Sequence, residues 1–329
     1  MHLLTDAVEA VRPLLAPGAG FARTRSDRLS SAERSAWRAF GGAFGGDTEV
    51  AFAATLPDAF GGNGPLVVIE HAPSSQFDRM HEILASGGDL PDGLVCVALA
   101  GARFRGQRGR TWAALRGNLH VSVHFSLDLD AAEAQTGLAV LPAVATATAI
   151  EAVSQGHVRP ATKWVNDLLV DGRKVAGVLT TTQLQAGRVQ HAVIGIGVNV
   201  AVTPPLPPEP RAAPPGSLGE SEPRFAADDA WAMLLPPLLQ ALERGRADLV
   251  AGRGDDLFEA YRARAGFLGK HVTIWPVDAG DLGEGKPVAR GRVQELRPDL
   301  SLVLEGIAEP VRFGRMTIDG AKQDVAADA

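Results

Sequence analysis

Cysteine is nearly absent from this chain of 329 residues, which contains a single one, Cys96. One thiol forms no disulfide within the chain, and it cannot build a cysteine metal site. Cys96 stands inside an apolar run. We therefore interpret it as a buried strand residue rather than a nucleophile.

An excess of positive charge is also missing, since the net charge is -6 at pH 7. Proteins that bind nucleic acid or an anionic membrane through their charge need a basic surface, so neither partner is expected. The N-terminus lacks the basic and then apolar pattern of a secretory signal. We also expect no apolar run of the ~20 residues that a membrane-spanning helix needs. These absences predict a cytoplasmic protein.

The length allows a large core and two domains. Leucine and valine spacing in residues 3–15 predicts a short amphipathic helix. Residues 1–63 as a whole stay unassigned, because they are too poorly periodic for a helix-turn-helix. We predict a catalytic domain over 64–264 and a small β domain with its tail over 265–329.

The middle of the chain alternates between strand and helix patterns. A hairpin is predicted from 162 to 179, with its turn at Asp171-Gly172. A helix at about 136–154 is apolar on several faces and is therefore expected to be buried. The remaining predicted elements are a helix at 77–86 and strands at 66–70, 94–99, 118–127 and 191–200.

The C-terminal third begins with a proline-rich stretch, 203–224, which predicts an extended, exposed loop. A helix is predicted over 226–242, where Pro236-Pro237 should kink or break it, and another over 257–265. From Gly266 onward, short alternating runs predict four to six strands in a barrel-like arrangement.

One segment, 103–112, concentrates positive charge, with the sequence Arg103-Phe104-Arg105-Gly106-Gln107-Arg108-Gly109-Arg110-Thr111-Trp112. Glycines let a backbone approach a ligand closely. Arginines bind phosphate or carboxylate through paired hydrogen bonds, and Trp112 offers a flat face for a ring. The pattern fits a nucleotide or an acyl-nucleotide. A basic run of this length is equally typical of a solvated surface loop.

Other polar or small residues stand in apolar surroundings. Ser74-Ser75-Gln76 precedes a predicted helix, either as its N-cap or as a small recognition cluster. Lys163 opens a predicted strand, and either extends to solvent or serves a function. Gly195 and Gly197 lie in a central strand, where side chains would otherwise block a ligand.

Three segments together resemble the biotin–protein ligases of the wider biotin/lipoate ligase family. They are Arg108-Gly109-Arg110-Thr111-Trp112 followed by Gly117-Asn118-Leu119; Lys163-Trp164-Val165-Asn166-Asp167-Leu168 with Asp171-Gly172-Arg173-Lys174-Val175-Ala176-Gly177; and Gly195-Ile196-Gly197-Val198-Asn199-Val200. The resemblance covers about residues 66–200 and 266–320. It implies an α+β fold: a class II synthetase-like catalytic domain with a mixed β-sheet and packed helices, and a small SH3-like β-barrel at the C-terminus.

The resemblance also implies an enzyme that makes biotinyl-5'-AMP from biotin and ATP, with Mg²⁺. The biotinyl group then passes to a lysine of a biotin carboxyl-carrier protein, and the enzyme is a monomer or a homodimer. Two alternatives stay open. One is a ligase or transferase of the same fold that uses lipoate or octanoate. The other is a non-catalytic module that binds an acyl group or a nucleotide.

Carried over residue by residue, the resemblance implies that Lys163, Arg108 and Arg110 are catalytic. It implies biotin contacts for Ser74, Ser75, Gln76, Gly101, Arg105, Gly106, Gln107, Lys163, Leu168, Gly195 and Gly197. It implies ATP contacts for Arg108, Arg110, Trp112, Asn166, Asp167, Lys174 and Asn199, with Asp167 also as a Mg²⁺ ligand.

Several positions depart from the family pattern, among them the start of the basic loop, where Phe104-Arg105-Gly106-Gln107 stands for Gly-Arg-Gly-Arg. Ser74-Ser75-Gln76 replaces Ser-Thr-Asn, and Val165 replaces a proline. Gly101 replaces a glutamine and so removes a polar contact to the ureido ring. Gln107 replaces an arginine that helps to retain the acyl-adenylate. These changes bear on the acyl substrate more than on adenylation. Residues 1–63 do not match the DNA-binding domain of some members, so no repressor role is expected.

Overall fold

Ten strands form one large mixed sheet in a computed structural model that describes residues 1–44, 50–62, 64–207, 209, 211–276 and 286–319. The strand order is β2-β3-β1-β4-β5-β6-β10-β9-β8-β7. The strands are β1 (His2–Thr5), β2 (Ala22–Arg25), β3 (Val50–Thr55), β4 (Leu66–Ile69), β5 (Val95–Ala98), β6 (Leu119–Asp130), β7 (Ala161–Lys163), β8 (Asp167–Val170), β9 (Arg173–Gln185) and β10 (Arg188–Val198).

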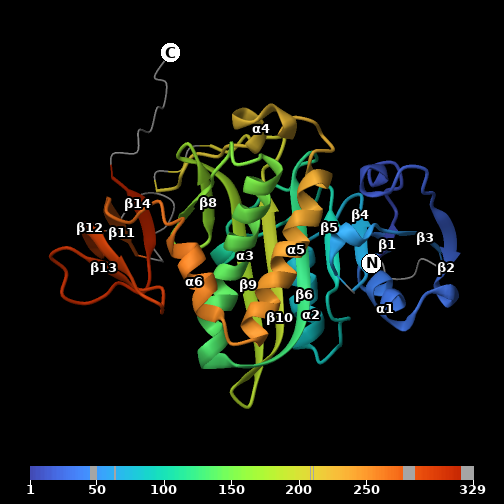
Figure 1. Ribbon diagram of the computed structural model, residues 1–329, viewed down its shortest axis with the longest axis horizontal. Coiled ribbons are helices and arrows are strands. Elements are labelled where there is room, and N and C mark those ends of the chain that lie inside the picture. The colour runs from blue at the N-terminus through green and yellow to red at the C-terminus, as the bar shows by residue number, and fades with distance from the viewer. Residues whose placement is uncertain (45–49, 63, 208, 210, 277–285, 320–329) are drawn as a thin grey trace.

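The two faces of this sheet carry separate apolar clusters, because successive side chains of a strand point to opposite faces. Leu66 and Val68 of β4 join a cluster with α3 (Ala131–Val153), α5 (Trp231–Val250) and α6 (Gly254–Arg262). Val67 and Ile69 join the other cluster, with α1 (Ser31–Phe40) and α2 (Gln76–Ala85). Figure 1 shows α3 and α5 lying over one side of the strands and running nearly along them, with α2 behind.

Helix α3 corrects the expectation that no segment is long and apolar enough to span a membrane. By length and composition its 23 residues could cross one, with a mean hydropathy of 1.6. Its apolar character has another cause here. The helix packs between β9, β10 and the helices α5 and α6, and 67% of its most apolar stretch is buried inside the protein. A helix that is enclosed on all sides is apolar on all sides.

The predicted helix over residues 3–15 is wrong. Strand β1 pairs antiparallel with β3 and parallel with β4, and only the short helix η1 (Arg12–Leu14) follows. Leu3 and Leu4 are both buried, one in each apolar cluster, as in a strand enclosed on both faces. The leucine spacing suits either structure locally, and pairing with β4 decides between them. The unassigned N-terminal residues that the structure describes thus extend the large sheet.

The hairpin predicted at Asp171-Gly172 is confirmed between β8 and β9, and both turn residues have positive φ (51° and 78°). The chain before it turns once more, because β7 and β8 are separate antiparallel strands. The remaining predicted strands and helices between 66 and 200 are present with small shifts of their ends.

Helix α5 runs from Trp231 to Val250 through Pro236 and Pro237, so the expected break is wrong. Two backbone donors are missing there. The buried leucines of the same turns, including Leu234 and Leu238, pack against the core and offset that loss.

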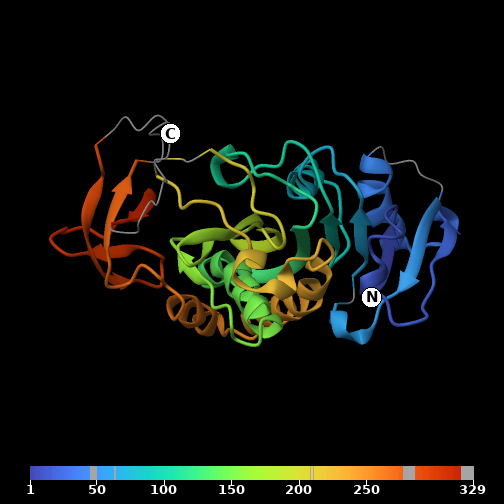
Figure 2. The ribbon, with the colours of Figure 1, turned by 90° about the horizontal axis from the view of Figure 1, so that it is seen from above.

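Four antiparallel strands form a second sheet at the C-terminal end, in the order β13-β12-β11-β14. They are β11 (His271–Trp275), β12 (Ala289–Leu296), β13 (Leu302–Leu304) and β14 (Arg315–Ile318). Figure 2 shows this sheet at one end of the molecule and β1–β3 at the other. The pairings among described residues confirm a small β unit of four antiparallel strands.

The proline-rich stretch is not a uniformly exposed loop, contrary to the expectation. It contains α4 (Leu218–Ser221) and the short helix η6 (Pro223–Phe225), and Arg211, Ser217 and Leu218 are buried. The remaining short helices are η2 (Ser26–Arg28), η3 (Gly42–Phe44), η4 (Asp58–Phe60) and η5 (Gln107–Gly109).

Candidate active site

One row of residues crosses five neighbouring strands of the large sheet. The strand register pairs His120 with Gly197, Gly197 with Gly177, Gly177 with Asp167, and Asp167 with Lys163. Residues directly opposite each other on paired strands project to the same face. The row therefore brings an imidazole, two glycines, a carboxylate and an ammonium to one face of the sheet.

The two glycines of the row leave room for the ring of Trp112. A Cβ atom at Gly197 would lie 2.4 Å from this ring, and one at Gly177 would lie 3.2 Å from it. Trp112 Nε1 donates a hydrogen bond to Nδ1 of His120, 3.2 Å away. The indole therefore lies on a flat glycine floor with one edge fixed by His120.

His120 is buried, and its burial lowers its pKa to about 4. The imidazole is therefore neutral at pH 7, with Nδ1 accepting from Trp112 and Nε2 3.2 Å from the carbonyl oxygen of Leu115. A neutral ring has one donor and one acceptor. Both are used here, which fixes the orientation of the imidazole.

A β-bulge brings Lys174 to the same face. The register pairs Leu168 with Ala176 but Leu169 with Lys174, so Val175 is an extra residue on β9. Such an insertion reverses the direction of the side chains beyond it. Lys174 Nζ consequently lies 2.7 Å from Oδ1 of Asp167, and 5.6 Å from the centroid of the Trp112 ring.

Lys163 is nearly enclosed, and burial lowers its pKa, with the charges of Lys174, Arg315 and Arg110 acting in the same direction. Asp167 opposes this shift. Burial raises the pKa of Asp167, but the charges of Lys174 and Lys163 outweigh it, and the pKa falls below its usual value. One carboxylate thus faces several cations, an arrangement that stabilises an anionic ligand.

Asp167 does not fit the role of a direct Mg²⁺ ligand. Its carboxylate already contacts the ammonium of Lys174. Among the described residues, no cluster of three metal-ligating side chains occurs. Protein-bound Mg²⁺ is held by free oxygen donors, and an ammonium competes for those oxygens.

The basic loop is folded back on itself. Gly106 donates to the carbonyl of Arg110 (2.7 Å), Trp112 donates to the carbonyl of Phe104 (2.9 Å), and Arg105 pairs with Thr111. The short helix η5 forms the tip. The loop is therefore a compact flap with its two aromatic residues at the base, rather than a solvated surface run.

Gly101 accommodates the other aromatic residue of the flap. A Cβ atom at this position would lie 2.3 Å from the ring of Phe104. The Phe104 ring stands edge-on to His120, with centroids 5.8 Å apart. Phe104, and not Gly101, lines the pocket. Gly101, which stands where the family pattern has glutamine, thus leaves a space that the Phe104 ring fills.

One end of the pocket is built from α2 and the strands below it. Ser75 caps α2 by accepting from the backbone N–H of Phe77, and the absence of a side chain at Gly195 makes room for the Phe77 ring. Gln76 Nε2 donates to the carbonyl of His120 at 2.7 Å, while its Oε1 is buried without a partner. This end is largely apolar, with a single unsatisfied acceptor.

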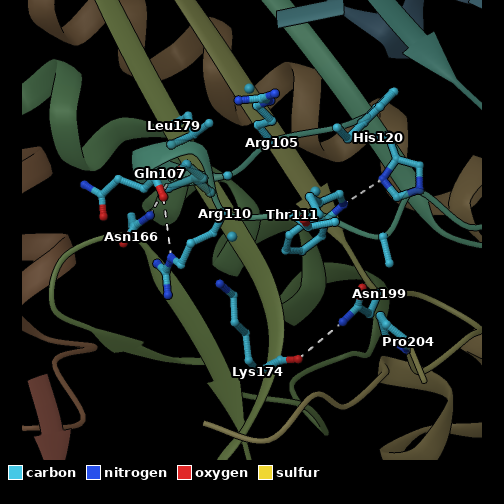
Figure 3. Close-up of a pocket in the computed structure, with 18 of the residues that line it drawn as sticks. Arg105, Gln107, Arg110, Thr111, His120, Asn166, Lys174, Leu179, Asn199 and Pro204 are labelled. Atoms are coloured by element: carbon cyan, nitrogen blue, oxygen red, sulfur yellow. Dashed lines mark hydrogen bonds between the residues drawn. The ribbon is translucent and has the colours of Figure 1, made fainter. Parts of the chain in front are cut away.

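The opposite end lies beyond Trp112. Lys174 and Asn199 meet there, and the chain from Pro204 to Pro215 closes it. Asn199 Nδ2 donates to the carbonyl of Gly216 at 2.9 Å, and its Oδ1 is buried without a partner. Figure 3 shows Lys174 and Asn199 on the side away from Leu179 and Arg105. The empty space of both ends, including the part open to solvent, is about 1160 Å³.

The structure brings most of the predicted site residues into this one pocket. Those that line it are Ser75, Gln76, Arg105, Gly106, Gln107, Arg110, Trp112, Asn166, Lys174, Gly195, Gly197 and Asn199. Lys163 and Asp167 lie outside its lining, although they continue the row of its floor. Ser74 and Gly101 also lie outside the lining, and Leu168 belongs to the core on the other face. The side chain of Arg108 lies outside the described residues.

Several pocket residues escaped the sequence analysis, among them Phe77, Phe104 and His120. One signal for His120 was present. In the strand pattern from 118 to 127, polar residues occupy every second position, at His120, Ser122 and His124. A buried strand with one polar face indicates a cavity or a buried network. No comparable local signal marks the chain from Pro204 to Pro215, whose role depends on its tertiary position.

Known proteins resemble this chain in sequence and in fold. A model of the biotin/lipoate A/B protein ligase family matches residues 84–199. The biotin–[acetyl-CoA-carboxylase] ligase of Paracoccus denitrificans is 34% identical over 170 residues, which are 51% of this chain and 69% of that protein. The chain belongs to the biotin/lipoate A/B protein ligase family.

In other relatives, the match with this chain covers a smaller share of the relative's length. The bifunctional ligase/repressor BirA of Bacillus spizizenii is 32% identical over 138 residues, or 42% of this chain, and the match spans 41% of BirA. The BirA of Escherichia coli is 34% identical over 116 residues, and there the match spans 35% of each protein. The chain thus spans about two-fifths of the length of these curated relatives.

The fold agrees with that of a solved family member. The biotin protein ligase from Aquifex aeolicus, in complex with biotin and ATP, superposes with a TM-score of 0.57 at 21% identity. The match covers 77% of this chain and 97% of that one. At this identity the likeness concerns the fold alone.

Proposed function

We propose that this ligase-family protein is an ATP-dependent biotin–protein ligase. It joins biotin to AMP as biotinyl-5'-AMP, and then transfers the biotinyl group to a lysine of a biotin carboxyl-carrier protein. The observation that carries the proposal is the position of Trp112, whose ring separates a largely apolar end of the pocket from an end with Lys174 and Asn199. A ligand with an apolar ring at one end and a nucleotide at the other fits such a pocket.

In the first step, a carboxylate oxygen of biotin attacks the α-phosphorus of ATP. A new P–O bond forms, the bond to the bridging oxygen of the β-phosphate breaks, and pyrophosphate leaves. Negative charge accumulates on the phosphoryl oxygens, so fixed cations lower the barrier. Lys163, Lys174 and Arg110 are the cations whose charges converge on the Asp167 side of the floor. Asp167 holds the ammonium of Lys174 through an ion pair, and its charge attracts the ammonium of Lys163.

In the second step, the amine of the acceptor lysine attacks the carbonyl carbon of the mixed anhydride. A C–N bond forms, the C–O bond to the phosphate breaks, AMP leaves with the electron pair, and the amine nitrogen gives up a proton to solvent. The flap 103–112 covers the pocket opposite the sheet and would limit the escape of the adenylate to water. Excluding water protects a reactive anhydride from hydrolysis.

We assign the biotin side to Ser75, Gln76 and Phe77, with the residues of the flap base around them. The unpaired Oε1 of Gln76 supports this assignment, because a buried acceptor without a partner suits an N–H donor of a ligand. We assign the nucleotide side to Trp112, Lys174 and Asn199. Trp112 would stack on the adenine ring or the adenylate.

Several broader features belong to the same proposal. The acceptor is a biotin carboxyl-carrier protein or domain, the ligase is cytoplasmic, and it acts as a monomer or homodimer. The four-stranded sheet would belong to a small SH3-like β-barrel domain, which with its tail spans residues 265–329, next to a catalytic domain over 64–264. Arg108 would act with Arg110 over the reacting phosphate.

The proposal is tested with purified protein, ATP and one acyl acid at a time, with biotin, lipoate and octanoate compared. We expect ATP-dependent pyrophosphate release with biotin, and transfer of labelled biotin to a carrier domain when that domain is added. Faster turnover with lipoate or octanoate would reassign the acyl substrate. The absence of pyrophosphate release with all three acids would indicate a binding module and would overturn the enzymatic proposal.

A further inference from the structure

The chain from Pro204 to Pro215, whose described residues we call the wall loop, touches the C-terminal sheet at two points. The guanidinium of Arg211 lies 3.9 Å from the centroid of the Trp275 ring. Oε2 of Glu209 lies 2.6 Å from Nη2 of Arg315. Trp275 belongs to β11 and Arg315 to β14. Two strands of the second sheet therefore contact a loop that follows β10 of the large sheet.

The two anchor points form one platform. Trp275 and Arg315 are directly opposite each other in the β11–β14 register. The Trp275 indole is fixed further by its Nε1, which donates to Oγ1 of Thr317 at 3.0 Å. Neighbouring cross-strand side chains share a face. The wall loop therefore meets a prearranged pair of an aromatic ring and a guanidinium.

Both arginines of these contacts are largely shielded from solvent. Arg211 is 8% exposed, and the Arg315 side chain is 18% exposed. Exposed ion pairs contribute little to stability, whereas a cation–π contact that is shielded from water is stronger. The contact between Arg211 and Trp275 is thus the stronger candidate for holding the loop.

The far end of the wall loop is held by the large sheet. Lys174 donates its backbone N–H to the carbonyl of Pro214 (2.8 Å), and Gly216 donates to the carbonyl of Lys174 (3.0 Å). The loop therefore ends beside the lysine that we assign to the nucleotide. Its prolines fix φ and leave the segment few conformations. A few side-chain anchors are enough to position such a chain.

Resting on the proposed function, we propose that Trp275 and Arg211 are positioning residues for the nucleotide. Together they hold the wall loop against the end of the pocket that contains Lys174 and Asn199. The Glu209–Arg315 pair supports the same placement. The C-terminal sheet thereby sets the affinity for ATP through the wall loop, while the biotin end is built from α2 and the flap base, away from this sheet.

The kinetic test compares Trp275→Ala with Trp275→Phe, which keeps an aromatic face, and with Phe313→Ala, which removes a 73% exposed ring from the same part of the chain. We expect Trp275→Ala to raise the KM for ATP about tenfold, as loss of a shielded cation–π contact would. The KM for biotin and the Kd for biotin without ATP should stay unchanged. Trp275→Phe should restore most of the ATP affinity, and Phe313→Ala should match the parent protein.

A double-mutant cycle tests whether Arg211 and Trp275 act together. If they form one contact, Arg211→Ala combined with Trp275→Ala raises the KM for ATP no more than either change alone. Additive effects would overturn the coupling. An unchanged KM for ATP in Trp275→Ala, or equal increases in KM for ATP and biotin, would overturn the positioning role.

A proteolytic readout is independent of turnover. Trypsin cleaves after arginine, and Arg211 is followed by Ala212 in the wall loop. In the full-length protein we expect slow cleavage after Arg211, and cleavage at least about tenfold faster in Trp275→Ala, because local opening exposes the bond. Equal cleavage rates would overturn the anchor. If the parent protein activates no acyl acid but the cleavage rates differ, the ligase proposal fails while the anchor stands.

Discussion

The ring of Trp112 occupies the space that a side chain at position 197 would fill. A Cβ atom at Gly197 would lie 2.4 Å from the indole, and His120 fixes the edge of that indole from the neighbouring strand. The relationship links three segments that are far apart in the sequence. It also explains why a central strand of a buried sheet carries glycine, which is otherwise unfavourable in a strand.

Gly197→Ala should displace Trp112 and lower kcat/KM for ATP by roughly 10- to 100-fold, because a contact of 2.4 Å cannot persist and a misplaced stacking surface is costly in catalysis. Pyrophosphate release at varied ATP would measure this effect. Gly20→Ala is the control, since a Cβ at Gly20 would meet nothing within 4 Å. If kcat/KM for ATP changes less than about twofold in Gly197→Ala, Trp112 does not bind the nucleotide.

Lys163→Ala should reduce adenylation by roughly 100- to 1000-fold, the usual loss when one positioned electrostatic donor is removed. The fold should persist, because Asp167 retains Lys174 as its partner. Biotin-dependent exchange of pyrophosphate into ATP would measure the step, with circular dichroism as the check on folding. The exposed Lys270 provides a matched control as Lys270→Ala. Turnover that survives in Lys163→Ala would place the reaction centre elsewhere.

His120 should make the protein pH-sensitive on the acid side. Its folded pKa of about 4 is below the ordinary 6.5, so the unfolded state binds more protons between these values, and stability falls as the pH decreases from 6.5 to 4. The contribution is complete above pH 6.5. Its full loss is about 3 kcal/mol for a single group with such a shift.

Denaturant unfolding at pH 7.0 and 5.0 would measure this dependence. In His120→Gln the acid-side loss of unfolding free energy should be smaller, since glutamine does not titrate. The same slope in both proteins would assign the pH dependence to other groups.

Gly101 and Phe104 should be energetically coupled. Gly101→Ala places a Cβ 2.3 Å from the Phe104 ring and should destabilise the protein by roughly 1–3 kcal/mol, as overpacking does. In the background of Phe104→Ala, the same change should cost less, because the opposing ring is gone and only the 2.9 Å approach of the Cβ to the carbonyl oxygen of Ala72 remains. Thermal unfolding of the two single variants and the double variant gives the coupling free energy. Strictly additive losses would show that Phe104 and Gly101 do not compete for that space.

Gln107→Arg should slow the escape of the acyl-adenylate. Gln107 lies in η5 at the tip of the flap and lines the pocket, so an arginine there adds a positive charge near the phosphate. Release of labelled adenylate from the preformed complex would be followed by rapid filtration. Gln107→Met is the matched control for side-chain length without charge. Equal release from all three proteins would mean that the flap closes with position 107 away from the phosphate.

The sequence was sufficient wherever function depends on a local pattern. The arginine–glycine flap, the Asp171-Gly172 turn and the apolar strands from 66 to 200 follow from composition and period, because turn chemistry and side-chain alternation act over a few residues. The glycines at 195 and 197 also indicated a close approach. The order of these motifs was enough to recognise the family.

Only the tertiary structure decided what meets across the sheet. The leucines near the N-terminus suit a helix locally, yet pairing with β4 makes them a strand. The register from His120 to Lys163, the bulge that turns Lys174 toward Asp167, and the anchoring of Arg211 on Trp275 each join residues from separate segments. Hydrogen-bond register and burial set these contacts, and both arise only when distant strands pair.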